Sequence, residues 1–273
     1  MGFKKIIFFI PFFTFFSLPL FAGNDYPSLG ARAAGMGNAA VTLSDVWSAN
    51  HNQAGLAFLK KPVAGTYYEN RFLLKEIGVK ALAFALPIKG GVFGMSFNYS
   101  GGTFYNESKL GLAYAKTFGE KLSIGMQMNY MGIRIAEGYG NKSVLTAEVG
   151  VLAKLTNELT IGAHIFNPTQ AKLTNYNNEK IATIMRLGLD YRFNKKVILA
   201  LETLKNSQEK PMLKIGLEYQ IMEKIFLRTG IATNPSLNTF GVGVKLNSLM
   251  LDFASSIHPV LGFSPKISMA YSF

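Results

Sequence analysis

The stretch Leu122–Met131 runs Leu-Ser-Ile-Gly-Met-Gln-Met-Asn-Tyr-Met, so that large apolar residues alternate with small or polar ones. The same alternation recurs at Met185–Phe193, Leu213–Gln220 and Lys266–Phe273. An apolar period of two indicates β-strands, because successive side chains of a strand point to opposite faces of the sheet. We therefore expect the chain from residue 62 onward to form strand hairpins.

The number and spacing of these strands favour a transmembrane β-barrel. The alternation predicts 14 antiparallel strands, beginning near residues 62, 76, 91, 108, 121, 143, 158, 182, 196, 212, 224, 239, 248 and 265. Each is close to the ~9–11 residues that a tilted membrane-crossing strand requires. Short turns alternate with longer loops, as in outer-membrane barrels, where the bulky face meets lipid and the other face lines the lumen.

The composition agrees with a membrane location. Charged residues make up only 16% of the 273 residues, which is below the roughly 25% of ordinary soluble domains. Cys is absent, which excludes disulfides and thiolate metal sites. The formal net charge is +12, and many lysines lie at the expected turns. We therefore expect this positive charge to contact anionic outer-membrane lipid rather than nucleic acid.

Residues 1–22 have the features of a secretory signal peptide. Lys4 and Lys5 precede an apolar stretch, Ile6–Phe21, and Ala22 supplies the small residue at a cleavage site. An uncleaved anchor is the alternative. No later stretch has the ~18–20 consecutive apolar residues of a transmembrane helix. An exported chain of this kind is either a soluble β protein or a barrel, and the alternation favours an integral barrel of the bacterial outer membrane, formed by residues 62–273.

Residues 23–61 do not share the alternation. They contain the small-residue run Gly30-Ala-Arg-Ala-Ala-Gly-Met-Gly37 and, further on, Asn50-His-Asn-Gln-Ala-Gly-Leu56. These two motifs resemble the N-terminal hatch of FadL-like outer-membrane barrels and are most similar to the PorV/PorQ family branch. Gln53 stands where that branch usually has Pro. The resemblance implies a hatch at residues 23–61 inside the lumen, with the characteristic residues Arg32, Gly35, Gly37, Asn52 and Gly55.

Charged residues on the small-residue face would line the lumen beside this segment. By strand alternation they are Glu148, Arg186, Asp190, Arg192, Glu202, Lys214, Glu218, Arg228 and Asp252. A buried Arg32 would need an acidic partner, and the five acids of this set are the candidates. We interpret the set as a structural network of ion pairs, with a substrate path as the alternative.

Motifs for catalysis and cofactor binding are missing from the sequence. The three histidines, His51, His164 and His258, lack metal-ligand spacing. The stretch Gly35–Gly37 lacks the strand–turn–helix context of a dinucleotide site. Ser256 and His258 are residue types found in hydrolases, but we place them in a loop. We therefore expect a non-enzymatic protein with no catalytic residues, no metal site and no cofactor.

The resemblance implies two possible functions. PorV-like relatives serve type IX secretion and surface attachment in Bacteroidota by binding other envelope proteins, whereas FadL relatives move hydrophobic small molecules across the outer membrane. The longest expected loop spans only residues 167–181, and capture of a lipophilic ligand requires a concave apolar pocket. We therefore expect the accessory role, with FadL-like transport as the alternative. Tyr271 and the terminal Phe273 resemble the C-terminal signal recognised by the barrel-assembly machinery.

Overall fold

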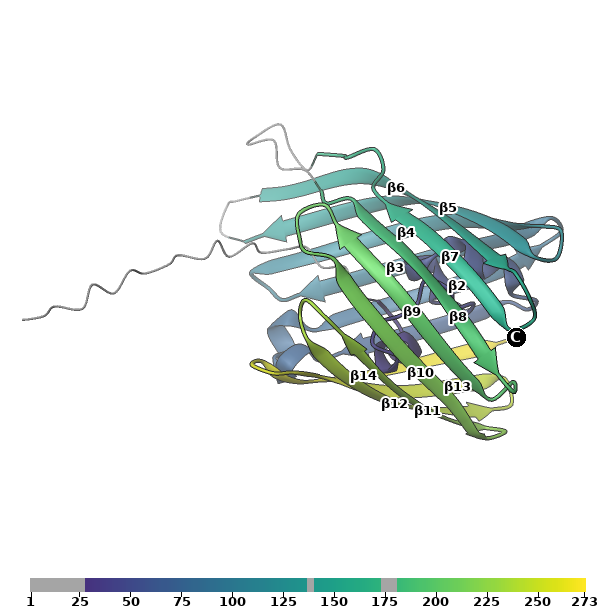
Figure 1. The fold of residues 1–273 in the computed structure, drawn as a ribbon. Coiled ribbons are helices and arrows are strands. Elements are labelled where there is room, and N and C mark those ends of the chain that lie inside the picture. Colours follow the sequence, from purple (N-terminus) through teal and green to yellow (C-terminus); the bar gives the residue numbers. More distant parts are fainter. Residues whose placement is uncertain (1–27, 137–139, 173–180) are drawn as a thin grey trace, which may run out of the picture.

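The computed structural model describes residues 28–136, 140–172 and 181–273, so the expected signal peptide lies outside the described residues. Fourteen antiparallel strands form one closed barrel (Figure 1). The strands are β1 (Val63–Glu69), β2 (Val79–Ile88), β3 (Gly91–Gly101), β4 (Tyr105–Phe118), β5 (Leu122–Ile135), β6 (Gly140–Lys154), β7 (Leu159–Phe166), β8 (Ile184–Phe193), β9 (Val197–Asn206), β10 (Met212–Met222), β11 (Ile225–Ala232), β12 (Leu237–Leu246), β13 (Leu249–His258) and β14 (Gly262–Ser272). Each strand begins within three residues of its expected position, so the predicted 14-stranded antiparallel barrel is confirmed.

Hydrogen bonding between the first and last strands closes the barrel. β1 pairs with β2 on one side and with β14 on the other. We call the end where β1 begins and β14 ends the short-turn end. The opposite end, which carries residues 70–78 and the connection from β7 to β8, is the long-loop end. Outer-membrane barrels keep their short turns in the periplasm and their longer loops outside, which orients this barrel.

The two faces of the wall differ as the alternation predicts. On β2, Leu82 points outward and is 53% exposed, whereas the inward Ala81 and Ala83 are 3% and 4% exposed. On β5, the outward Met126 and Met128 are also largely exposed. Large apolar side chains therefore cover the outer surface, where the hydrocarbon core of the membrane solvates them. The architecture is that of an integral outer-membrane β-barrel.

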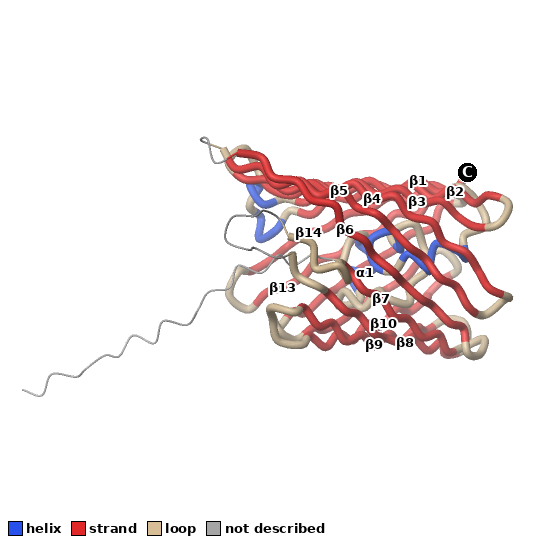
Figure 2. Tube along the Cα trace, turned by 90° about the horizontal axis from the view of Figure 1, so that it is seen from above, coloured by secondary structure: helices blue, strands red, loops and turns tan. Residues whose placement is uncertain are grey.

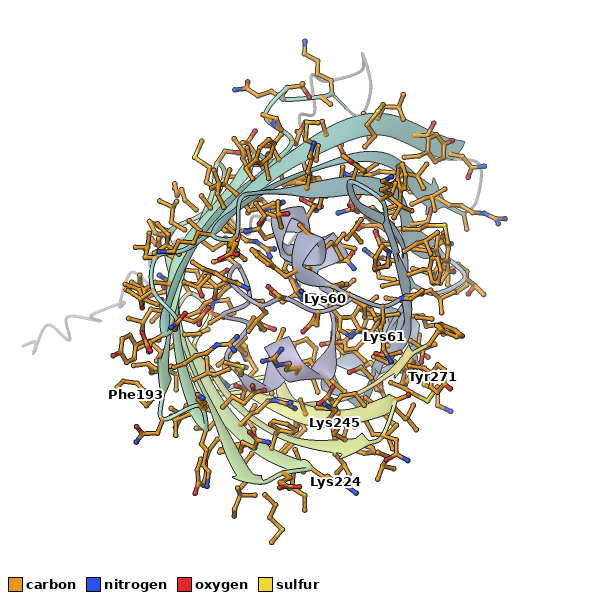
Figure 3. The ribbon with its side chains drawn as sticks, turned by 90° about the vertical axis from the view of Figure 1, so that its right-hand side faces the viewer. Lys60, Lys61, Phe193, Lys224, Lys245 and Tyr271 are labelled. Atoms are coloured by element: carbon orange, nitrogen blue, oxygen red, sulfur yellow. The ribbon has the colours of Figure 1, made fainter. Side chains whose placement is uncertain are left out.

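Short helices occupy the interior of the barrel. α1 (Ala31–Gly35), α2 (Ser48–His51) and the 3-10 helix η1 (Gln53–Phe58) belong to residues 28–61, which we call the N-terminal segment. The view along the barrel from the short-turn end shows these helices enclosed by the ring of strands (Figure 3). α1 contacts β11 to β14, and η1 contacts β3 to β6. The segment therefore bridges opposite sides of the wall.

Two further 3-10 helices, η2 (Arg71–Leu73) and η3 (Lys75–Ile77), form the connection between β1 and β2. They lie at the long-loop end (Figure 2), where η2 packs against β14. No helix within the described ranges is both long and apolar enough to cross a membrane.

Apolar side chains hold the N-terminal segment against β1, β2 and β3. Trp47 meets Tyr67 edge to face, with ring centroids 5.8 Å apart. Val46 and Leu56 join the same buried cluster, which includes Ala83 of β2. Because each of these side chains is removed from water, their burial is a main source of stability on this side of the lumen.

Candidate functional site: the N-terminal segment and the lumen wall

Glycines in the wall let the N-terminal segment approach β10 and β11 at backbone distance. Gly216 and Gly230 are cross-strand neighbours. A Cβ at Gly230 would lie 2.2 Å from the backbone nitrogen of Gly37, and a Cβ at Gly216 would lie 2.4 Å from the carbonyl oxygen of Met36. Gly37 has a φ of +63° and lies against the backbone of Ile231, so both its conformation and its surroundings favour glycine.

The hydroxyl of Thr239 on β12 joins this part of the segment to the wall. It accepts a hydrogen bond from the backbone nitrogen of Gly37 at 2.9 Å and lies 3.0 Å from the carbonyl oxygen of Gly35. A Cβ at Gly35 would lie 3.1 Å from the Cα of Gly241. The two predicted glycines of the first motif, Gly35 and Gly37, are therefore at the contact between segment and wall.

The second motif packs against another glycine pair on the far side of the lumen. Gly125 and Gly150 are cross-strand neighbours on β5 and β6, and a Cβ at Gly150 would lie 1.9 Å from Asn52 Oδ1. The amide nitrogen of Asn52 donates to the carbonyl oxygens of Val41 at 2.8 Å and Val151 at 3.0 Å. Asn52 thus joins the segment to itself and to β6.

Gly55 has a different role from the wall glycines. A Cβ there would lie 2.6 Å from the carbonyl oxygen of Leu43 and equally close to the hydroxyl of Ser48. Its contacts are thus within the N-terminal segment, and glycine allows residues 43–55 to fold back on themselves.

Arg32 finds its acidic partner on β10. Its guanidinium donates to both carboxylate oxygens of Glu218, at 2.7 and 2.9 Å, and lies 3.3 Å from Asp45. Glu218 also accepts from Arg228 at 2.6 Å, and Arg228 reaches Asp252 at 2.7 Å. Burial lowers the pKa of Arg32, but the charge and hydrogen bonds of Glu218, together with the charges of Asp45 and Asp252, raise it by more. Arg32 is therefore a permanent cation within a paired chain of charges.

A second carboxylate of the wall, Glu202 on β9, binds the backbone of the segment. Its Oε2 accepts hydrogen bonds from the backbone nitrogens of Ala40 and Val41, both at 2.8 Å. Its Oε1 accepts from Lys214 on β10 at 3.0 Å. Hydrogen bonds to a carboxylate are stronger than those between neutral groups, so Glu202 ties residues 40 and 41 to the wall.

A third carboxylate, Glu148 on β6, lies at the centre of a buried polar cluster. Lys109 donates to it at 2.5 Å, and the ring of His164 lies 2.9 Å away. The amide of Gln53 donates to it at 2.7 Å, and that of Asn129 at 2.9 Å. Sequence alone identified Glu148 but none of these four partners as site residues. The contact with Glu148 also gives a reason for glutamine at position 53.

The other predicted lumen residues differ in their surroundings. Arg186 and Asp190 are buried, at 4% and 2% exposed. The side chain of Arg192 is 54% exposed and lies 3.8 Å from Asp190. Arg192 is thus not buried in the lumen as expected, because it is the second-last residue of β8 and lies at the rim of the short-turn end. Eight of the nine predicted lumen residues are buried.

His51 is fully buried beside the charged wall. Burial, together with the charge of Arg186, lowers its pKa to about 3. Neither ring nitrogen has a hydrogen-bond partner of good geometry among the described residues. His51 is therefore neutral at physiological pH. No group of three potential metal ligands occurs in the described part of the chain.

An apolar layer faces inward nearer the long-loop end. It comprises Met131, Phe166, Ile181, Ile184, Leu204, Met212 and Ala232, with Val144 and Leu237 packed against them. These residues come from the eight consecutive strands β5 to β12 and from the connection before β8. On the side formed by β5 to β12, the lumen thus changes from apolar at the long-loop end to charged beside the N-terminal segment, whereas on the opposite side Glu69 and Lys266 form an inward ion pair.

Two further expectations concern the ends of the strands. Tyr271 and Phe273 both point outward at the short-turn end, with ring centroids 5.0 Å apart. Figure 3 shows Tyr271, Phe193, Lys224 and Lys245 around the rim of that end, with Lys60 and Lys61 over the middle of the ring. The loop expected at Ser256 and His258 is wrong, because β13 continues to His258 through its pairing with β14.

Comparison with protein-family models gives no match, and comparison with curated proteins gives none either. Solved structures do match. The monoaromatic hydrocarbon channel CymD is 11% identical, with a TM-score of 0.72 over 92% of this chain and 99% of CymD. The toluene transporter TodX of Pseudomonas putida is 12% identical, with a TM-score of 0.72 over 91% of this chain and 98% of TodX.

A FadL homologue of Pseudomonas aeruginosa is also similar, at 12% identity and a TM-score of 0.67 over 92% of this chain and all of that one. CymD is named as a channel and TodX as a transporter. The neighbours do not distinguish a PorV/PorQ branch. At these identities the likeness concerns the fold, and the chain has the fold of FadL-like outer-membrane channels.

Proposed function

We propose that this barrel passes small hydrophobic molecules across the outer membrane, and that residues 23–61 form a hatch that closes its lumen. The observation that carries the proposal is the shared fold with two hydrocarbon channels over more than nine tenths of the chain. This favours the transport alternative over the accessory role expected from the short loops.

The lumen offers a physical basis for such a route. A hydrophobic molecule that enters from the long-loop end meets the apolar layer first, where it loses contact with water at little cost. The N-terminal segment then blocks the way. Three carboxylates hold the segment: Glu218 through Arg32, Glu202 through the backbone of residues 40 and 41, and Glu148 through Gln53. Passage therefore requires this segment to move or loosen.

The accessory role remains a second candidate, favoured by the short connections at the long-loop end. In that role the barrel would bind other envelope proteins, as in type IX secretion, and would belong to the PorV/PorQ branch. In both cases we propose that residues 1–22 direct export and that Tyr271 and Phe273 are recognised by the barrel-assembly machinery. Their outward position at the short-turn end supports the latter assignment.

A disulfide between segment and wall tests the transport proposal. The chain has no Cys, and a Cβ at Gly150 would lie 3.0 Å from the Cγ of Asn52. In a disulfide, the Cβ of one cysteine lies about 3 Å from the sulfur of the other cysteine. A cysteine at position 52 with its sulfur in the place of Asn52 Cγ would have this distance to the Cβ of a cysteine at position 150. The double variant Asn52→Cys/Gly150→Cys should therefore cross-link when oxidised. The substitution Asn52→Cys also removes Oδ1, the atom with which a Cβ at position 150 would clash.

Uptake of radiolabelled toluene is measured in a Gram-negative host that lacks its own hydrophobic-compound channel. We expect uptake above the empty vector for the original chain and the reduced double variant, and its loss on oxidation. The double variant Asn52→Ser/Gly150→Ser controls for the substitutions themselves, because it removes the same Asn52 amide and cannot form a disulfide. Uptake equal to the empty vector for the correctly inserted original chain would refute transport of this substrate class. Uptake that persists in the fully cross-linked barrel would refute movement of the segment at this site.

A further inference from the structure

A groove of about 460 Å³ lies on β1, β2 and β3. It is lined by Thr66, Tyr67, Lys80, Ala81, Leu82, Phe97 and Tyr99. The strand registers arrange its outward side chains in rows. Lys80 lies between Tyr68 and Tyr99, and one step nearer the membrane centre Leu82 lies between Thr66 and Phe97. Thr66 is the smallest member of its row, so the groove is deepest where a large side chain is missing.

The groove is a depression in the outer face and not an opening into the lumen. Pairing of β1 with β2 is continuous from Val63 to Glu69, and pairing of β2 with β3 is continuous from Val79 to Ile88. The hydrogen-bonded wall therefore forms its floor. An occupant of this groove comes from the membrane around the barrel.

Lys80 determines the chemistry at the outer end of the groove. It is the second residue of β2 after the long-loop end, and its side chain is exposed on the outer face. Within the described residues, no acidic side chain forms an ion pair with it. Tyrosines and lysines at the end of a spanning strand lie at the depth of the lipid head groups. Lys80 therefore presents a positive charge at the depth where a lipid of the outer leaflet carries its phosphate.

The connection between β1 and β2 extends the same surface. Leu73, Leu74 and Ile77 are 62%, 53% and 38% exposed there. Phe72 and Leu73 have left-handed φ angles of +51° and +61°, a conformation that is unfavourable for such side chains. The backbone nitrogen of Phe72 is held by the hydroxyl of Ser264 at 3.0 Å. The loop thus keeps apolar side chains exposed beside Lys80, where acyl chains can cover them.

From this arrangement we propose that β1–β3 and residues 70–78 bind one phosphorylated glycolipid of the outer leaflet. One acyl chain lies in the groove over Thr66, Leu82 and Phe97, and a phosphate meets Lys80. The groove volume is within the ~300–1,000 Å³ of sites that bind small molecules, and its mostly apolar walls with one cation match a chain that ends at a charged head group. The site is independent of transport through the lumen.

Native mass spectrometry of the detergent-solubilised barrel tests this proposal, with diphosphorylated lipid A as the probe. We expect one adduct at limiting lipid. Lys80→Gln should weaken it about fivefold, because one lysine near a membrane surface contributes about that factor. Thr66→Trp, which fills the groove from an exposed position, should remove it. The matched control is Lys205→Gln, since Lys205 is also an outward lysine at the long-loop end, on β9. Unchanged heat-modified migration on gels shows that each variant is folded.

The proposal requires a phosphate and this groove together. Equal binding of lipid A from which the phosphates have been removed, or of phosphatidylglycerol, would overturn the assignment to a phosphorylated glycolipid. Equal loss in Lys80→Gln and Lys205→Gln, or full binding in Thr66→Trp, would overturn the location. Selective loss in the two groove variants, with binding retained in the control, would support it.

Discussion

Gly230→Ala measures how closely the N-terminal segment depends on the glycines of the wall. The added Cβ would lie 2.2 Å from the backbone nitrogen of Gly37 and 2.4 Å from the carbonyl carbon of Met36. Ordinary contact begins at 3.4 Å, so the segment has to withdraw by about 1.2 Å, the difference of the two distances. Because its nearest atoms are backbone, no side-chain rotation can relieve the clash.

This withdrawal breaks the contacts through Thr239. The 2.9 and 3.0 Å separations from Thr239 to Gly37 and Gly35 would lengthen beyond hydrogen-bond distance. Two lost hydrogen bonds of about 1 kcal/mol each, with at least about 1 kcal/mol for overpacking, destabilise the docked segment by about 3 kcal/mol. A change of this size corresponds to roughly a 100-fold increase in the open population.

Hydrogen exchange measured by mass spectrometry reports this opening, because the backbone nitrogens of Gly37, Ala40 and Val41 all donate to side chains of the wall. We expect exchange of residues 35–41 to accelerate roughly 100-fold. The control is Gly132→Ala on β5, where an added Cβ has only the hydroxyl of Ser108 within 4 Å, at 3.1 Å. If Gly230→Ala exchanges at the same rate as this control, the close approach of segment and wall is not what holds the segment in place.

Three other changes have expected outcomes. Glu218→Leu leaves Arg32 without its bidentate partner, so the free energy of unfolding in urea should fall by about 3–5 kcal/mol, and the Arg32→Leu/Glu218→Leu pair should be less destabilised than the sum of the single variants. Gln53→Pro removes the 2.7 Å bond to Glu148 and should cost about 1–3 kcal/mol; an unchanged urea midpoint would show that this contact is dispensable. The pKa of His51 is about 3 in the folded protein and 6.5 when the ring is exposed. Below about pH 6.5 the unfolded state therefore gains a proton that the folded state does not bind. The free energy of unfolding then falls by up to about 1.4 kcal/mol per pH unit as the pH falls toward 3. His51→Gln should flatten this slope in urea titrations between pH 5 and 7.5, and an equal slope in both proteins would exclude His51 as its cause.

Much of the barrel follows from local sequence. Strand alternation placed the five acids, including Glu148, Glu202 and Glu218, on the inward face, and all five are buried there. The period of two decides which face a residue takes, because each strand position rotates the side chain by half a turn. The alternation does not show how far a residue lies from the rim of the barrel. Arg192 has the alternation of an inward residue but lies at the rim, and His258 lies in a strand rather than a loop.

The sequence alone determined the strand count, the face of each side chain and the presence of an N-terminal segment unlike the strands, since these depend on residues that are neighbours along the chain. The folded barrel was needed to show that Arg32 binds Glu218 and that Gln53 binds Glu148. It was also needed to show that two wall glycines, Gly216 and Gly230, let Met36 and Gly37 approach the wall. These partners lie on strands that are far from the N-terminal segment in sequence. They meet the segment only when the strands close into a barrel around it. The register between two strands decides which inward residues lie at the same level of the lumen, and the sequence of a single strand does not contain that information.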